Sequence, residues 1–166
     1  MGASLEEPRR LGMLALAQEI VRVTDEALWK LGELGQQKKT SEAAGRERPK
    51  ILVVDDQVLV ADTLTEILGN YGFHAVAAYG GETALEIAKK SQPDYLLTDI
   101  LMPFMNGVEL AIAIRKMFPH TRILLFSGQA GITDLLLRAQ QQGYEFELVA
   151  KPIHPERLVK ILRNKK

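Results

Sequence analysis

Five polar residues in the C-terminal two thirds of the chain have the types and positions that phosphoryl chemistry needs. Asp55-Asp56, Asp99, Ser127 and Lys151 each follow a short apolar run. Carboxylates that lie close together raise one another's pKa, and a hard divalent cation relieves that repulsion. Mg²⁺ suits this role because it prefers sites with few carboxylates, water and phosphate oxygens. A carboxylate nucleophile, a metal, a hydroxyl donor and an ammonium group together are what in-line phosphoryl transfer needs.

Apolar runs alternate with amphipathic stretches from residue 50 to the end of the chain. We expect strands at 51–54, 74–79, 95–98, 123–126 and 146–150, and helices at 58–70, 81–90, 108–118, 132–142 and 155–163. Strict alternation predicts an α/β fold, a doubly wound five-stranded parallel sheet of order 2-1-3-4-5, flavodoxin-like. Ligands bind at the carboxyl ends of such strands. The five polar residues should therefore converge at one edge of the sheet.

Together these residues resemble a known signature. They are Asp55-Asp56, then Asp99-Ile100-Leu101-Met102-Pro103-Phe104-Met105-Asn106-Gly107, then Ser127-Gly128, then Lys151-Pro152. In this order they resemble the response regulator receiver domain of two-component signalling, over residues 50–166. The chain looks like a stand-alone, chemotaxis-regulator-like member of that family.

The resemblance implies a magnesium site. Asp56 would bind Mg²⁺, with Asp55 ligating it directly or through water and Asp99 as a further ligand. The main-chain carbonyl of Leu101 would complete the protein ligands.

The resemblance also implies the roles of the reacting groups. Asp99 would accept a phosphoryl group from a histidine kinase or a histidine phosphotransfer protein. Ser127 would donate a hydrogen bond to the phosphoryl oxygens, and Lys151 would pair with them. A cis peptide before Pro152 would aim the lysine.

One position departs from the family pattern, and two others bear on the kinetics of dephosphorylation. The family has an aromatic switch residue three positions before the lysine, where this chain has Leu148. Phe146 lies on the same strand face, and Tyr144 is near. Leu101 and Gln129 occupy the positions that influence attack by water on the phosphorylated residue. We expect Leu101, which cannot hydrogen-bond to water, to slow dephosphorylation.

Other chemistry is also open to these carboxylates. An aspartyl-nucleophile phosphohydrolase of the haloacid dehalogenase kind also has an aspartate after its first strand. That family requires the motif Asp-x-Asp there. This chain does not have that motif, because Asp55 and Asp56 are adjacent and Gln57 follows. A nucleotide site would need a Gly-rich or Lys-Ser/Thr phosphate loop, which is missing after the first strand. A receiver that acts without phosphorylation is the remaining alternative.

Charge and hydropathy give no reason to expect several classes of partner. Lys+Arg and Asp+Glu both number 21, so the formal net charge is zero and favours neither nucleic acid nor an anionic membrane. There is no cysteine, and no apolar run approaches the ~20 residues needed to span a bilayer. We expect a cytoplasmic protein that is modified rather than an enzyme that turns over. The chain ends just after its last helix, so we expect no attached output domain and an unidentified downstream protein partner.

The N-terminal third divides into two further regions. Residues 1–34 contain an amphipathic helix, residues 35–49 form a polar linker, and residues 50–166 form the receiver domain. The apolar positions of the helix follow a 3-4 rhythm: Leu14, Ala17, Val21, Thr24, Leu28 and Leu31. Such a face predicts docking on a partner or a homodimer through this helix; packing on its own receiver and an over-extended gene start are alternatives.

Overall fold

A computed structural model describes residues 48–128 and 132–164 of the chain. The strands are β1 (Lys50–Val54), β2 (His74–Ala78), β3 (Tyr95–Asp99), β4 (Arg122–Ser127) and β5 (Glu147–Ala150). Near-continuous apolar runs such as Ile51–Val54 of β1 are typical of strands covered on both faces. All five lie parallel in the order β2-β1-β3-β4-β5, which confirms the predicted topology.

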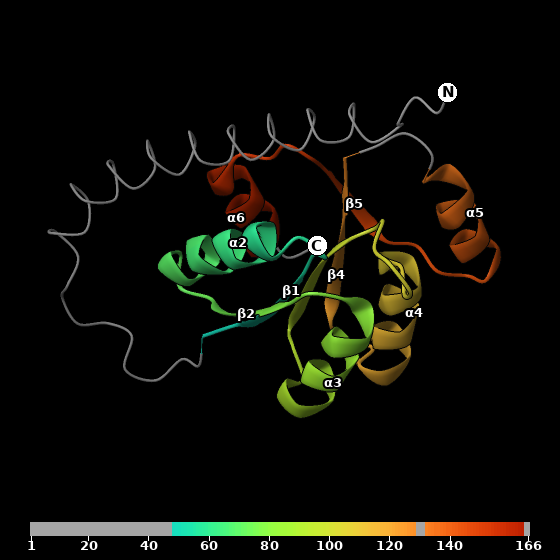
Figure 1. Ribbon diagram of the computed structural model, residues 1–166, viewed down its shortest axis with the longest axis horizontal. Helices are drawn as coiled ribbons and strands as arrows, with labels where there is room; N and C mark the ends of the chain where they lie inside the picture. The colour runs from blue at the N-terminus through green and yellow to red at the C-terminus, as the bar shows by residue number, and fades with distance from the viewer. Residues whose placement is uncertain (1–47, 129–131, 165–166) are drawn as a thin grey trace, which may run out of the picture. The chain divides into compact units, whose positions relative to one another are not determined.

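Helices alternate with the strands and cover both faces of the sheet (Figure 1). They are α2 (Val58–Asn70), α3 (Gly81–Ser91), α4 (Gly107–Met117), α5 (Thr133–Gln141) and α6 (Pro155–Arg163). One apolar layer joins α3, α4 and α5 to the sheet, and a second joins α2 and α6 to its other face. The predicted boundaries agree with the structure to within about two residues, as expected for helix and strand ends.

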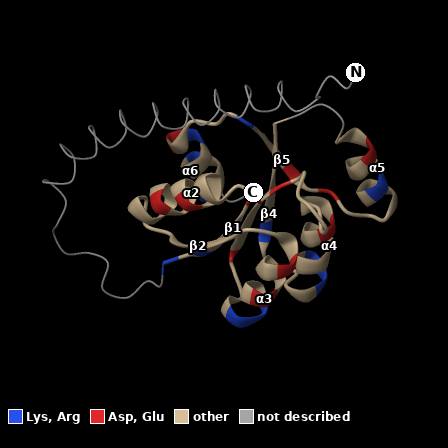
Figure 2. Ribbon diagram, viewed as in Figure 1, with Lys and Arg blue, Asp and Glu red and all other residues tan. Residues whose placement is uncertain are grey.

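Four of the described helices carry acidic side chains at the N-terminal end and basic side chains at the C-terminal end. An acidic residue lies in the first turn of α3, α4, α5 and α6, and basic residues lie in the last turn of each. Figure 2 shows this separation on α3, α4 and α5. The placement suits the helix dipole, which favours anions at the N-terminus and cations at the C-terminus. Because helices start at the carboxyl ends of the strands, that edge carries the added acidic side chains.

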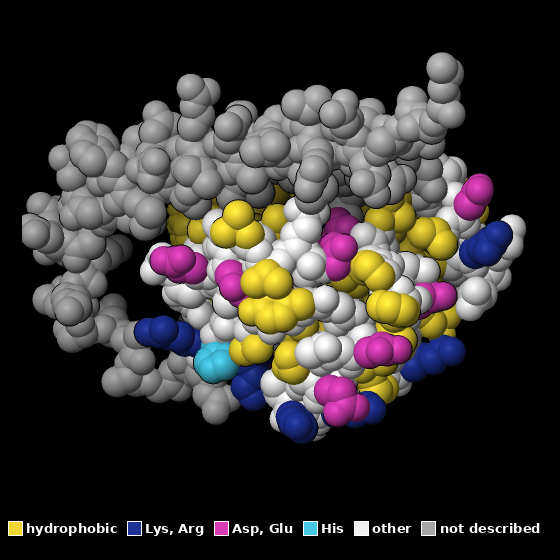
Figure 3. Space-filling view, in the orientation of Figure 1, with side chains coloured by type: hydrophobic (Ala, Val, Ile, Leu, Met, Phe, Trp, Pro, Cys, Tyr) yellow, Lys and Arg dark blue, Asp and Glu magenta, His cyan; other side chains and the backbone are white. Residues whose placement is uncertain are grey.

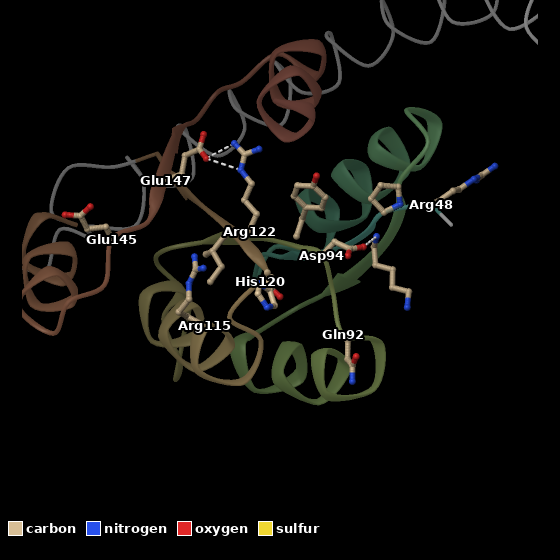
Figure 4. Close-up of a pocket in the computed structure, with 13 residues that line it drawn as sticks. Arg48, Gln92, Asp94, Arg115, His120, Arg122, Glu145 and Glu147 are labelled. Atoms are coloured by element: carbon tan, nitrogen blue, oxygen red, sulfur yellow. Dashed lines mark hydrogen bonds and ion pairs between the residues drawn. The ribbon is translucent and has the colours of Figure 1, made fainter. Parts of the chain in front are cut away.

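At the amino-terminal edge of the sheet, the guanidinium group of Arg122 contacts both β5 and the end of α6. Arg122 at the start of β4 forms an ion pair with Glu147 of β5, at 2.8 Å between Nη2 and Oε2. Its Nη1 also donates to the carbonyl oxygens of Leu162 and Asn164, at 3.2 and 2.6 Å. Figure 4 shows the Arg122–Glu147 pair beside an open hollow of about 810 Å³ that carries both acids and bases. Arg122 therefore gives donors to the free carbonyls at the end of α6.

Two expectations cannot be compared with the structure. The helix predicted within residues 9–34, and all of the 35–49 linker except its last two residues, lie outside the described residues. In the described ranges, no helix has the length and hydropathy of a membrane span.

Candidate functional site

The strand register brings the predicted site residues to one edge of the sheet. Asp99 closes β3, and its neighbour across the ladder is Phe126 of β4, one residue before Ser127. Ser127 in turn pairs with Ala150, one residue before Lys151. On the other side of β3, Val54 pairs with Thr98, so Asp55 and Asp99 leave adjacent strands side by side. The loops after β1 and β3 reach this same edge (Figure 1).

Lys151 joins two of the carboxylates. Its Nζ lies 2.8 Å from Oδ2 of Asp55 and 2.8 Å from Oδ1 of Asp99, and it donates a hydrogen bond to each. All three side chains are largely shielded from solvent, with 13%, 2% and 16% exposed for Lys151, Asp55 and Asp99. Charge-assisted hydrogen bonds in such a setting are stronger than those between neutral groups. The ammonium group therefore fixes both carboxylates in place.

The pKa values of two groups reflect this cluster. Burial alone would lower the pKa of the Lys151 ammonium group, but the charges of Asp55 and Asp99 and its hydrogen bonds to them raise it above the usual value. The pKa of Asp56 is raised by desolvation, and then by the negative charges of Asp55 and Asp99, against a smaller lowering by Lys151. Three carboxylates thus face a single ammonium group, which leaves excess negative charge.

Asp55 has a second role in positioning the first helix. Its Oδ1 accepts a hydrogen bond from the backbone N–H of Gln57, at 3.0 Å. Gln57 is the residue that precedes the first turn of α2, and its own side chain makes no capping bond. The two oxygens of this buried carboxylate therefore have different partners. Oδ1 accepts from the N–H at the start of α2, and Oδ2 pairs with Lys151.

Close packing of the backbone at Gly107 restrains the backbone of Asp99. A Cβ atom at residue 107 would collide with the main-chain carbonyl oxygen of Asp99, so only glycine allows this approach. Asn106 holds Gly107 there, since its side chain accepts from the backbone N–H groups of Val108 and Glu109 in a capping box. Residue 107 must therefore be glycine because the helix start lies this close to the backbone of Asp99.

The remaining site residues lie around Asp99. The backbone N–H of Leu101 donates to Oδ2 of Asp99 at 3.2 Å, while the Leu101 side chain is 44% exposed. The backbone carbonyl of Ser127 accepts from the N–H of Lys151 at 2.8 Å, and the bond between Lys151 and Pro152 is cis. Gln129 lies outside the described residues.

The donor set fits Mg²⁺ when phosphate oxygens and water share the coordination. Asp55, Asp56 and Asp99 supply hard oxygen atoms, and the excess negative charge around Asp56 favours a divalent cation. In the described ranges, no three His, Cys, Asp or Glu side chains form a ready metal cage. Mg²⁺ commonly keeps several waters and binds through one or two carboxylates plus phosphate, so it needs no such cage.

The aromatic residues near β5 precede the strand, although we expected Phe146 to lie on it. Leu148 is 48% exposed on the strand, and Tyr144 and Phe146 stack on each other with ring centroids 6.2 Å apart. Both rings pack against the apolar layer of α3, α4 and α5. The aromatic side chains are thus placed before the strand, away from the position next to Lys151.

Sequence reasoning missed one feature next to the site. Phe104, in the loop after β3, has a φ angle of 65° and is 99% exposed. Tyr79, just after β2, donates its hydroxyl to Oδ1 of Asp62 at 2.8 Å. Phe104 stands among other apolar residues in the sequence, so its exposure gave no signal, and its positive φ has no sequence signature at phenylalanine.

Comparisons with known proteins agree with this geometry. Residues 51–163 match the family model described as the response regulator receiver domain. A response regulator receiver protein of Anaeromyxobacter is 33% identical over 110 residues, which covers 66% of this chain and 45% of that protein. The autoinducer 1 sensor kinase/phosphatase LuxN of Vibrio campbellii is 33% identical over 89 residues, covering 54% of this chain and 10% of LuxN. The chain thus spans less than half the length of these relatives.

Solved structures show the same fold. The chemotaxis protein CheY4 of Vibrio cholerae has a TM-score of 0.63 and 28% identity, covering 70% of this chain and 98% of that one. A receiver domain protein from Clostridium thermocellum has a TM-score of 0.63 and 27% identity, covering 70% of this chain and 92% of that one. With a family match over most of its length and a CheY-like sheet that places the signature residues at one edge, this chain belongs to the response regulator receiver domain family of two-component systems.

Proposed function

We propose that Asp99 accepts a phosphoryl group in a Mg²⁺-dependent reaction and that this modification switches protein–protein contacts. The observation that carries the proposal is the bridge made by Lys151, which holds Asp99 through one oxygen at 2.8 Å. Among the described residues, the other oxygen, Oδ2, accepts one longer hydrogen bond, from the N–H of Leu101 at 3.2 Å. A largely shielded carboxylate with one freer oxygen is suited to attack a phosphorus atom in line with its leaving group.

The transfer step conserves atoms and charge in a simple way. Oδ2 of Asp99 forms a bond to phosphorus while the bond to the donor breaks, and the departing atom keeps the electron pair. With a phosphohistidine donor that atom is a ring nitrogen; with acetyl phosphate it is a carboxylate oxygen. The product is an acyl phosphate on Asp99; its added negative charge would pair with Lys151 and accept a hydrogen bond from the Ser127 hydroxyl, since both residues follow or end neighbouring strands at this edge.

Asp55, Asp56 and the carbonyl of Leu101 are the groups that would hold Mg²⁺. When bound, the ion neutralises charge on the transferred phosphoryl oxygens. Asp56 is the main ligand in this proposal because its carboxylate takes no part in the Lys151 bridge. Asp55 is engaged by Lys151 and Gln57, so its contribution runs through water or through the oxygen that Lys151 releases.

The donor in this proposal is a histidine kinase or a histidine phosphotransfer protein, and a separate protein reads the phosphorylated state. The LuxN match supports the link with kinases, since that relative is itself a sensor kinase. The chain acts as a substrate modified once per cycle, with self-dephosphorylation as its only turnover. A haloacid dehalogenase-like phosphohydrolase would instead release phosphate continuously.

Stoichiometry and metal dependence test this proposal together. Full-length protein is incubated with acetyl phosphate, with Mg²⁺ or with excess chelator, and intact-mass spectrometry counts phosphoryl groups per chain. We expect at most one group per chain, formed only with Mg²⁺, and a loss of most of it in Asp56→Asn. Asp134→Asn, an exposed change on α5, is the matched control. Undiminished modification in chelator or in Asp56→Asn, or steady phosphate release many times the protein concentration, contradicts the proposal.

A further inference from the structure

A small hollow lies beside the carboxylate cluster. It measures about 340 Å³ and is formed by the segment before and at the start of α3 together with the loop after β3. Its walls include the aromatic rings of Tyr79 and Phe104, the carboxylates of Asp56 and Glu82, and the side chain of Met105. Among its described lining residues there is no lysine, arginine or histidine. Aromatic faces and carboxylates around one space favour a cation.

Phe104 stands in a position that its own fold does not explain. Its φ angle of 65° lies in the left-handed region, which bulky L-residues rarely adopt. Its side chain is 99% exposed, so burial within the described domain does not offset this strain. Strained residues of this kind cluster at binding and functional sites. The exposed ring is therefore available to a molecule that approaches the site.

Tyr79 gives the hollow a second, fixed aromatic wall. Its hydroxyl donates to Oδ1 of Asp62 on α2, at 2.8 Å, which restrains the direction of the ring. Half of its surface is still exposed. A restrained aromatic side chain loses little conformational entropy on binding, so it makes an effective contact.

The charge of the hollow comes chiefly from Glu82. Asp56 would share its charge with Mg²⁺. Glu82 lies in the first turn of α3, is exposed and forms no ion pair with another described residue, so its charge could serve a second cation. On the face shown in Figure 3, hydrophobic side chains gather in the middle with acidic ones among them, and most Lys and Arg side chains lie toward the lower edge. The surroundings therefore complement a positively charged ligand.

We propose that this hollow receives an arginine side chain of the protein that docks at Asp99. A guanidinium group stacks on aromatic rings and pairs with a carboxylate at the same time, which matches Phe104, Tyr79 and Glu82. This inference rests on the proposed function, because a protein phosphodonor must bring its reacting group to Asp99, and the hollow shares Asp56 with that site.

A small-molecule probe tests the hollow without a partner. N-acetyl-arginine amide is titrated into ¹⁵N-labelled full-length protein at saturating Mg²⁺ and constant ionic strength, with N-acetyl-citrulline amide as the uncharged isostere. We expect saturable shifts of the backbone amide resonances of residues 79–83 and 104–105. The dissociation constant for the citrulline probe should be about fivefold or more weaker, since it lacks the charge.

Paired variants assign the binding to the proposed walls. Glu82→Gln and Phe104→Leu should each weaken the arginine probe several-fold, while Phe104→Tyr should retain it because the aromatic face is kept. Glu86→Gln, one turn further along α3 and also exposed, is the matched control for charge. Equal affinities for the two probes, shifts confined to other regions, no shifts, or unchanged binding in both Glu82→Gln and Phe104→Leu overturn the inference.

The same labelled sample separates this inference from the proposed function. Treatment with acetyl phosphate and Mg²⁺ needs no docked protein, so it reports on Asp99 alone. Phosphorylation without arginine binding refutes only the proposal that the hollow receives an arginine side chain. Arginine binding without phosphorylation keeps the cation site and removes the proposed phosphoacceptor function.

Discussion

At the scale of single residues, the site is organised by one ammonium group. Lys151 holds Asp55 and Asp99 at 2.8 Å each, and the charges of both carboxylates keep the lysine protonated. Asp55 also caps α2 through the N–H of Gln57. Because these contacts share side chains, a change at Asp99 reaches Lys151 directly. We expect phosphorylation of Asp99 to change the contacts of Lys151, which directly follows β5.

We propose that the side chain of Leu101 limits the access of water to phosphorylated Asp99. It is partly exposed next to Asp99, and it cannot hydrogen-bond to an attacking water. We predict that Leu101→Asn dephosphorylates about fivefold faster than wild type, since one hydrogen bond worth about 1 kcal/mol corresponds to about that factor. The decay of phosphorylated protein, followed by intact-mass spectrometry after removal of acetyl phosphate, measures this. Leu137→Asn, at an exposed leucine on α5, is the control. Equal decay rates for wild type and Leu101→Asn count against the idea.

Gly107 should be the least replaceable glycine in the described part of the chain. Alanine there would bring a Cβ into the carbonyl oxygen of Asp99, so we predict a loss of about 3 kcal/mol in the free energy of unfolding. A methyl group added at Gly69 in α2 would meet no atom within 4 Å outside its own helix backbone. Gly69→Ala should therefore stabilise the protein by about 0.5–1 kcal/mol. Urea denaturation of both variants checks the contrast, and equal stabilities would refute it.

At the scale of elements, the sequence was most informative where patterns were long and periodic. The apolar runs of β1, β3 and β4 and the alternation with helices predicted the sheet order, and every element expected between residues 50 and 163 is present. Three consecutive leucines of α5 cannot all face the core of a helix-covered sheet. Leu135 and Leu136 pack against the core, and Leu137 is half-exposed.

Contacts between side chains distant in sequence could not be predicted in the same way. The sequence placed Lys151, Asp55 and Asp99 at one edge, but it could not say that the ammonium group bridges both carboxylates. The left-handed φ of Phe104 and the collision behind Gly107 depend on how the loop after β3 closes against the strand. Such features arise from tertiary packing, for which local pattern carries no signal.

Arg122 is the element-level contact with the clearest energetic consequence. It pairs with Glu147 and donates to the carbonyls of Leu162 and Asn164, so its removal leaves one partly buried carboxylate and two carbonyls without a donor. We predict that Arg122→Met lowers the free energy of unfolding by about 2 kcal/mol. Lys89→Met, in an exposed pair with Glu86, should change it by less than about 0.5 kcal/mol. Thermal unfolding of the two variants measures this difference. Equal losses in the free energy of unfolding would show that the contacts of Arg122 do not stabilise the fold.

At the scale of the whole molecule, we propose two surfaces for signalling. One is the carboxyl edge of the sheet, where the acidic helix starts and the carboxylate cluster meet. The other is the apolar face that the sequence predicts within residues 9–34. A receiver domain transmits its state through contacts, so the partner of each surface determines what the modification controls.

The predicted N-terminal helix should change the assembly of the protein. We expect the full chain to self-associate at high micromolar concentration and a chain that starts at Arg48 to remain monomeric, because the latter lacks the apolar face. Sedimentation equilibrium of the two proteins measures this directly. Equal monomer masses would exclude the homodimer and leave docking on the receiver or on another protein.

The most direct measurement of the central claim is the location of the phosphoryl group. Wild type, Asp99→Asn and the control Asp134→Asn are treated with acetyl phosphate and Mg²⁺, and intact-mass spectrometry compares the fraction modified. Because Asp99 carries the nucleophilic oxygen and the bond to Lys151, we predict one phosphoryl group on wild type and on Asp134→Asn, and none above background on Asp99→Asn. Modification of Asp99→Asn to the same extent as wild type would contradict the account.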